Sequence, residues 1–281
     1  MREIDVAAVT EAVAKLAVDA CRFIGEDVRS FFAAALEREE SETGKDILRQ
    51  LLQNAEIAEE EQVPLCQDTG FTVVYLDVGQ DVHFVGGSLE EAVNEGVRRG
   101  YAEGYLRKSM VQRPFTDREN TGDNTPAIVH TRIVPGDQVK ITVLPKGGGA
   151  ENMSALAMLK PSQGRAGVVD FVVNTVSNAG PNACPPLIVG VGIGGSFDKV
   201  AYLAKKAILR EVGSVNPEPH LAELEDELER RCNDLGIGPM GMGGRITVMD
   251  VFVEEHPTHI ASLPVAVNIQ CHSARHKEVT L

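Results

Sequence analysis

Apolar residues recur every three or four positions along the first sixty residues of the chain. This spacing places them on one face of a helix, so residues 3–62 are expected to be helical. A run of three glutamates, residues 59–61, is expected to be a solvated helix end. The first apolar face consists of Val6, Val9, Val13, Leu16, Ala20 and Ile24, and a second of Ile47, Leu48, Leu51, Leu52 and Ala55.

The pattern changes near Val63, where runs of β-branched and aromatic residues begin. Such runs are typical of strands, and the segments between them keep helical spacing. A Pro-Gly-Asp turn between two strand-like runs predicts a hairpin of residues 127–134 and 138–145. Further strands are expected at 71–78, 186–193, 245–255 and 265–271, and helices at 88–109, 163–179, 198–212 and 220–235.

Helices and strands therefore mix along the chain without strict alternation. The expected fold is α/β (mixed α+β), with a mixed sheet flanked by helices and a helical N-terminal segment. We expect that helical segment to span residues 1–62, and one continuous α/β catalytic domain to span residues 63–281. No internal repeat or low-complexity tract interrupts this pattern.

The balance of charge narrows the choice of partners. The chain has 27 Lys and Arg against 41 Asp and Glu, a formal net charge of −14. An acidic protein is repelled by nucleic acid and by anionic membrane surfaces, so neither is an expected partner. The N-terminus lacks the apolar run of a signal peptide, and no segment approaches eighteen apolar residues. We therefore expect a cytoplasmic protein with reduced cysteines.

Five cysteines fall into two groups. Cys21 and Cys232 lie on apolar helix faces and are expected to fill the core. Cys66, Cys184 and Cys271 lie at strand ends or in loops, beside Pro, Gly, Asn or polar residues. None belongs to a C-x-x-C pair, and their wide spacing leaves both a shared metal site and separate loop roles open. Three thiolates on a [4Fe–4S] cluster would leave one iron able to act as a Lewis acid on a 2-hydroxy acid.

Two glycine-rich stretches indicate loops that approach a ligand. Gly190, Gly192 and Gly195 spell the dinucleotide-binding pattern G-x-G-x-x-G, but no second strand lies between them and Glu211, the acidic residue at the required spacing. A nicotinamide-dependent oxidoreductase therefore stays an alternative. The second stretch, "KGGGAEN" (146–152), would allow close backbone approach and an anion-binding nest.

Together these segments resemble the iron–sulfur (class I) fumarate hydratases from about residue 41 to 281. The motifs that carry the resemblance occur in one order along the chain. They are "CQDTG", "TGDNTP", "KGGGAEN", "NACPPLIVGVGIGGS", "AILR", "GPMGMGG" and "C…AR". Tartrate dehydratases are close relatives with similar cysteine motifs, and the "GGGxEN" form favours fumarate hydratase.

The resemblance implies a set of site residues. It implies that Cys66, Cys184 and Cys271 hold a [4Fe–4S] cluster. It also implies that Gln67, Asp68, Arg107 and Gly149 contact the substrate, with Asp68 as an acid–base group. The alternatives without a catalytic role are a turn residue for Asp68 and a surface residue at a helix end for Arg107. The roles of His272, Arg275 and His276 stay open.

The chain stops at Leu281, soon after the third cysteine, whereas single-chain members of this family continue into a second domain. The resemblance therefore implies the α subunit of a two-subunit enzyme, in an α2β2 assembly with a β subunit that completes the active site. The expected reaction is the interconversion of fumarate and L-malate. The alternative within the same family is the α subunit of an L-tartrate dehydratase.

Overall fold

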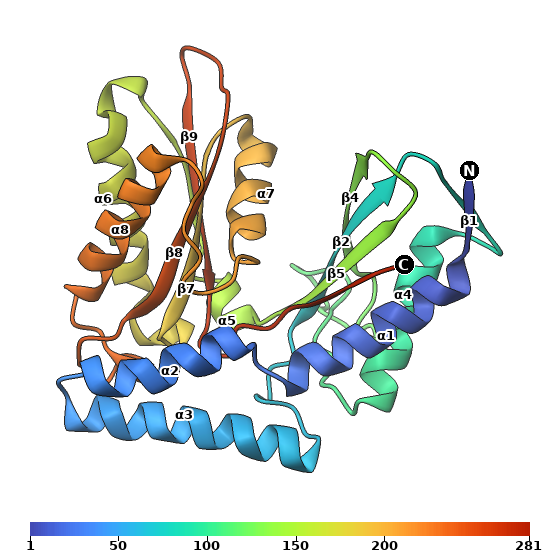
Figure 1. Cartoon of the computed structure of the whole chain (residues 1–281), viewed down its shortest axis with the longest axis horizontal. Helices are drawn as coiled ribbons and strands as arrows, with labels where there is room; N and C mark the ends of the chain where they lie inside the picture. The colour runs from blue at the N-terminus through green and yellow to red at the C-terminus, as the bar shows by residue number, and fades with distance from the viewer. The chain divides into compact units, whose positions relative to one another are not determined.

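The computed structural model describes residues 1–281 and divides them into two compact units. The first unit comprises Met1–Ile24, Ala55–Gly148 and Arg275–Leu281, and the second comprises Gly25–Asn54 and Gly149–Ala274 (Figure 1). The division assigns the N-terminal helices to different units, so the compact units do not follow the limit expected at residue 62. Each unit has a sheet and a hydrophobic core of its own.

The first unit is built on a four-stranded mixed sheet in the order β10-β5-β2-β4. Its central strand, β2, has five consecutive buried residues and pairs antiparallel with β5 and parallel with β4. A separate two-stranded parallel ribbon joins β1 and β3. The bounds are β1 Arg2–Asp5, β2 Phe71–Gly79, β3 Val82–Val85, β4 Ile128–Val134, β5 Val139–Lys146 and β10 Lys277–Thr280.

The hairpin predicted around Pro135–Asp137 is wrong, because β4 and β5 do not pair with each other. The strand β2 lies between them and pairs with both. The turn crosses the end of β2, where Gly79 donates to Gln138 O at 2.8 Å. A Cβ on Gly79 would lie 2.4 Å from Gly136 O, so only glycine fits beneath this turn. A strand as apolar as β2 needs neighbours on both edges, and that need decides the pairing.

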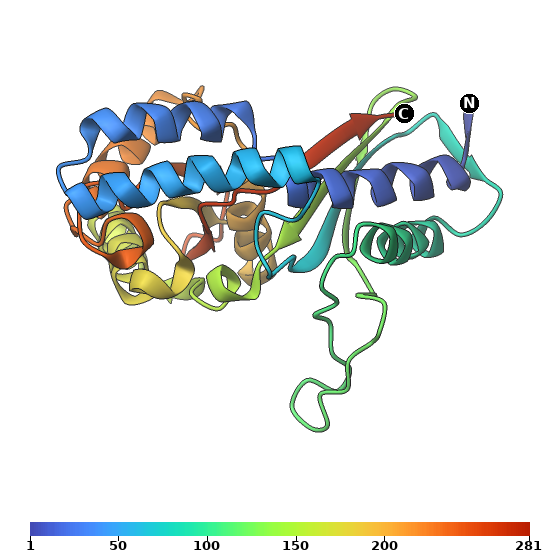
Figure 2. The same ribbon diagram turned by 90° about the horizontal axis from the view of Figure 1, so that it is seen from below.

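Helices α1 (Val6–Arg22) and α4 (Leu89–Glu103) pack against each other and against this sheet. Gly100 permits their close approach, since a Cβ there would lie 2.7 Å from Ala14 O. Ser88 caps α4, as its hydroxyl accepts a hydrogen bond from Glu91 N. The helix predicted to reach residue 109 ends at residue 103, and Figure 2 shows the following segment extending away from α4 and β4.

The second unit is built on another four-stranded mixed sheet, in the order β6-β9-β7-β8. Its core lies between one face of this sheet and helices α6 and α8, while α7 covers the other face (Figure 1). The strands are β6 Ala155–Leu159, β7 Leu187–Gly194, β8 Val248–His256 and β9 Leu263–Gln270. The helices are α2 Glu26–Arg38, α6 Gly164–Ala179, α7 Phe197–Ala207 and α8 Pro219–Asn233, with short 3₁₀ turns η1 Pro161–Gln163, η2 Gly180–Ala183 and η3 Pro239–Gly241. The division between the units falls within α3 Glu42–Glu61 and after the first residue of α5 Gly148–Glu151.

The link between α2 and α3 is fastened by a buried carboxylate. Glu39 is 2 % exposed, and it accepts hydrogen bonds from the amides of the two residues that follow it and of Arg245 and Ile246, at 2.8–3.0 Å. Burial opposes ionisation of Glu39, but these amides together hold the pKa of its carboxyl below its usual range. Glu39 thus anchors Arg245 and Ile246, which directly follow the glycine-rich segment 238–244, to the link between α2 and α3.

The mixed α/β fold class and the helical N-terminal segment are confirmed. The structure differs in having two four-stranded sheets instead of one. The short strands β1, β3, β6 and β10 have too few residues to show a period in the sequence. None of the helices has the length and apolar character that crossing a membrane requires.

Candidate active site

Asp68 connects the first cysteine motif, "CQDTG", to the three consecutive glycines at residues 147–149, here called the glycine triple. Its Oδ1 accepts from Gly70 N at 2.9 Å, which closes a local turn. Its Oδ2 accepts from Gly148 N at 2.8 Å, eighty residues further along the chain. The turn role therefore holds, but the carboxylate also brings "CQDTG" and "KGGGAEN" together, which no local pattern reveals.

A buried arginine lies beneath this loop. Arg275 is 1 % exposed, and its Nη1 donates to Asp68 O at 2.7 Å. A Cβ on Gly147 would lie 3.2 Å from Arg275 Nη2 and 3.3 Å from Asp68 Oδ2, so the glycine leaves room for both groups. The sequence alone leaves the role of Arg275 open, and the structure shows that it supports the backbone of Asp68.

The remaining predicted residues of the first unit gather on the same loop. The Cys66 thiol is half-buried, and its Sγ accepts from Asp68 N at 3.4 Å and donates to Gln67 Oε1 at 3.2 Å. Thr69 Oγ1 donates to Arg107 O at 2.9 Å and so fixes the backbone of Arg107 beside the loop. The Arg107 side chain is exposed to solvent and is shaped for a bidentate grip on a carboxylate.

The back of the loop is closed by buried side chains of α1 and α4. Tyr101 donates from its hydroxyl to Thr69 O at 2.8 Å, and the Cys21 thiol lies 3.9 Å from the same oxygen. Burial raises the pKa of Cys21 to about 11, so this thiol stays protonated. The core position predicted for Cys21 is confirmed, and so is that of Cys232, where burial raises the pKa to about 12.

In the second unit, sheet pairing brings two cysteine segments side by side. Cys184 precedes β7 and Cys271 follows β9. Because these strands pair antiparallel, both residues lie at the same end of the sheet. His272 N donates to Cys184 O at 3.2 Å and joins the two segments directly. The spacing of 87 residues between these cysteines gives no hint of this proximity.

The segment around Cys184 also lies beside Gly149. Cys184 has a φ of 55°, a left-handed conformation that is uncommon outside glycine and that often marks functional sites. A Cβ on Gly149 would lie 3.4 Å from Asn182 O, at ordinary contact distance. The Cys271 thiol lies 3.2 Å from Ser273 Oγ. Gly149, Cys184 and Cys271 thus form the second unit's share of the predicted residues.

The three predicted cluster ligands are divided between the units, with Cys66 in the first and Cys184 and Cys271 in the second. All three are free thiols, half-buried in loops, which is the donor type that iron–sulfur clusters take. In donor type, therefore, the three cysteines fit the cluster. The structure does not, however, hold any group of three or more His, Cys, Asp or Glu side chains in a metal-binding arrangement.

The glycines of the dinucleotide-like pattern have a packing role. A Cβ on Gly190 would lie 2.1 Å from Ala204 O, and one on Gly192 would lie 2.2 Å from Val200 O. The backbone of α7 therefore rests directly on β7, which only glycine permits. Helix packing accounts for these two glycines without a bound nucleotide.

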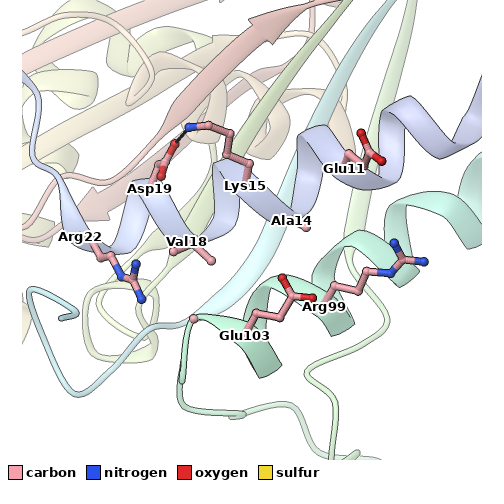
Figure 3. A pocket seen from close by; sticks show the side chains of 9 residues that line it. Glu11, Ala14, Lys15, Val18, Asp19, Arg22, Arg99 and Glu103 are labelled. Atoms are coloured by element: carbon pink, nitrogen blue, oxygen red, sulfur yellow. Dashed lines mark hydrogen bonds and ion pairs between the residues drawn. The ribbon is translucent and has the colours of Figure 1, made fainter. Parts of the chain in front are cut away.

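A groove of about 430 Å³ lies between α1 and α4 in the first unit (Figure 3). Its walls carry charges of both signs, including the ion pair of Lys15 with Asp19, and it contains none of the predicted site residues. The groove is therefore separate from the loop that carries Cys66 and Asp68.

Comparison with known proteins agrees with the motifs. The family model described as fumarate hydratase (Fumerase) matches residues 10–280. A putative L(+)-tartrate dehydratase subunit alpha from Methanocaldococcus jannaschii is 43 % identical over 276 residues, covering 95 % of each chain. L(+)-tartrate dehydratase subunit alpha from Escherichia coli is 36 % identical over 270 residues, covering 95 % of this chain and 88 % of the relative. The chain belongs to the fumarate hydratase family.

Proposed function

We propose that this chain is the cluster-bearing α subunit of an iron–sulfur hydro-lyase that interconverts fumarate and L-malate. The observation that supports this most is the position of the Asp68 carboxylate, which accepts from the amides of Gly70 and Gly148. An acid–base group is thereby fixed on the loop that also carries Cys66 and holds the backbone of Arg107. This combination serves removal of water from a hydroxy acid.

In this proposal Cys66, Cys184 and Cys271 hold a [4Fe–4S] cluster. Bound there, such a cluster supplies Lewis acidity toward the hydroxyl of the substrate through its iron without a thiolate. Arg107 binds a substrate carboxylate through two parallel N–H···O bonds. The amide of Gly149 faces a carboxylate without steric hindrance, because glycine has no side chain.

Elimination removes a hydroxyl from one carbon and a proton from its neighbour, and leaves a carbon–carbon double bond without net oxidation. Asp68 is the group of this chain that exchanges a proton with the departing oxygen, and the base that takes the carbon-bound proton comes from a β subunit. The relatives' names support the existence of a second subunit, because both are called subunit alpha.

The test is anaerobic reconstitution with and without the β subunit. We expect the chain alone to show an absorbance band at about 400 nm from the cluster. We expect turnover of fumarate only when the β subunit is added. Full turnover by the chain alone would contradict the need for a partner. A colourless, iron-free protein that stays inactive with β would contradict the proposed function itself.

The second candidate is an L(+)-tartrate dehydratase α subunit, which the names of the two relatives favour. Tartrate carries a hydroxyl on each of the two central carbons, whereas malate carries one. The reconstituted complex should therefore be assayed with L-malate, fumarate and L(+)-tartrate under one set of conditions. A higher kcat/KM for L(+)-tartrate than for L-malate would select the second candidate.

A further inference from the structure

The glycine triple has no side chains of its own to hold it in place. Residues 147–149 are all glycine, and the helix they enter, α5, has only four residues. A helix of one turn has no stability of its own, and ordering each glycine costs about 1–2 kcal/mol of conformational entropy. Besides the hydrogen bond from Gly148 N to Asp68, the loop therefore depends on the residues that follow it.

Glu151, the last residue of α5, supplies that attachment within the second unit. One carboxylate oxygen, Oε1, accepts from Lys205 Nζ of α7 in an ion pair. The other, Oε2, accepts from Asn268 Nδ2 of β9 at 2.9 Å. Both charged side chains are largely shielded, with 28 % of Glu151 and 15 % of Lys205 exposed, so the pair is less screened than a surface pair.

The exit of the loop is fastened to the same strand. Asn268 Nδ2 also lies 3.1 Å from Ser154 Oγ, and Ser154 Oγ accepts from Ile269 N at 3.1 Å. Ala150 is buried in the core of the second unit. The segment from Ala150 to Ser154 is therefore held at three residues, Ala150, Glu151 and Ser154.

The close packing of α7 makes the ion pair possible. The backbone of α7 rests on Gly190 and Gly192 of β7, with Ala204 O directly above Gly190. Lys205 is the next residue of the helix, and this packing brings its side chain to Glu151. The dinucleotide-like glycines thereby contribute indirectly to the position of the second glycine stretch.

We propose that Glu151, held by Lys205 and Asn268, is a positioning residue that fixes the amide of Gly149 for carboxylate binding. This proposal rests on the function proposed above, in which Gly149 contacts the substrate. A pre-positioned amide binds the substrate without ordering the loop first, so losing the attachment weakens substrate binding more than it slows the chemical step.

The test uses the full chain reconstituted with its β subunit. Glu151→Gln and Lys205→Met should each raise the KM for the hydroxy acid by about tenfold and change kcat by less than about threefold. Lys205→Arg keeps the charge and should restore the KM to near the wild-type value. Arg165→Met, which removes an exposed ion pair with Glu227 in the same unit, is the control and should leave the KM unchanged.

A second readout does not depend on activity. Amide hydrogen exchange over residues 147–151, measured on the chain itself, should be faster by about tenfold or more in Glu151→Gln and Lys205→Met than in Arg165→Met. Unchanged exchange, or faster exchange with a wild-type KM, overturns the proposal. If the wild-type complex turns over none of the acids, the proposed function fails while the exchange rates still decide whether Glu151 holds the loop.

Discussion

Arg275 Nη1 lies 2.7 Å from the backbone oxygen of Asp68, and the arginine is almost completely buried. A buried guanidinium that donates to a carbonyl restricts the backbone that carries the proposed acid–base group, Asp68. Arg275 directly follows the segment that carries the third cysteine, so the residue connects the end of the chain to the first cysteine motif.

Replacing Arg275 with methionine should therefore reduce both stability and turnover. The change leaves Asp68 O without its donor, which costs about 1–3 kcal/mol of unfolding free energy. We expect kcat to fall by about tenfold or more, because the carboxylate of Asp68 loses its fixed orientation. Thermal unfolding and steady-state kinetics of the α–β complex measure the two effects. Equal kcat in Arg275→Met and wild type would contradict the positioning role.

The three loop cysteines should differ from the two core cysteines in iron binding. Cys66→Ser, Cys184→Ser and Cys271→Ser are each expected to lose the cluster or hold it weakly, because a cluster on two thiolates is easily released. Iron and acid-labile sulfide content after anaerobic reconstitution measure this. Cys232→Ala is the control, since its thiol is buried in the core of the second unit, and it should keep its iron. Loss of iron in that control would contradict the ligand assignment.

The glycines should separate into structural and functional positions. Gly190→Ala would place a Cβ 2.1 Å from Ala204 O and should destabilise the second unit by about 1–3 kcal/mol. Gly149→Ala meets only Asn182 O at 3.4 Å and should leave the unfolding temperature nearly unchanged. The same methyl group stands where we propose the substrate carboxylate approaches, so the KM should rise. A strongly unfolded Gly149→Ala would show that this glycine is structural.

Glu39 should make the stability of the chain depend on pH in the acid range. Its folded pKa is lowered, so its contribution is fully present above the unfolded value of about 4.3 and is lost as pH falls through the folded pKa. Glu39→Gln removes the charge that the four amides stabilise, and should cost about 1–3 kcal/mol at pH 7. Urea unfolding of both proteins from pH 7 to pH 3 measures this. The difference between them should shrink below about pH 4, and a constant difference would contradict the assignment.

Local sequence patterns determined the elements and the chemical groups. Helical spacing in the first sixty residues and the β-branched runs at 71–78 and 186–193 were sufficient for the main helices and strands, because burial of one face imposes a period on the sequence. The separation of core from loop cysteines followed from the same patterns. Residue types alone were sufficient to name thiols, a carboxylate and a glycine loop as the candidate chemistry.

Only the tertiary structure decided which of these groups meet. The pairing of β2 between β4 and β5, the proximity of Cys184 to Cys271 and the bond from Gly148 to Asp68 all join residues distant in sequence. Strand order depends on which apolar surfaces can be buried together, and that is a property of the whole sheet. The partners of Arg275 and Glu151 follow from the same packing. The sequence gives the type of each charged residue, but only the folded chain determines which group it contacts.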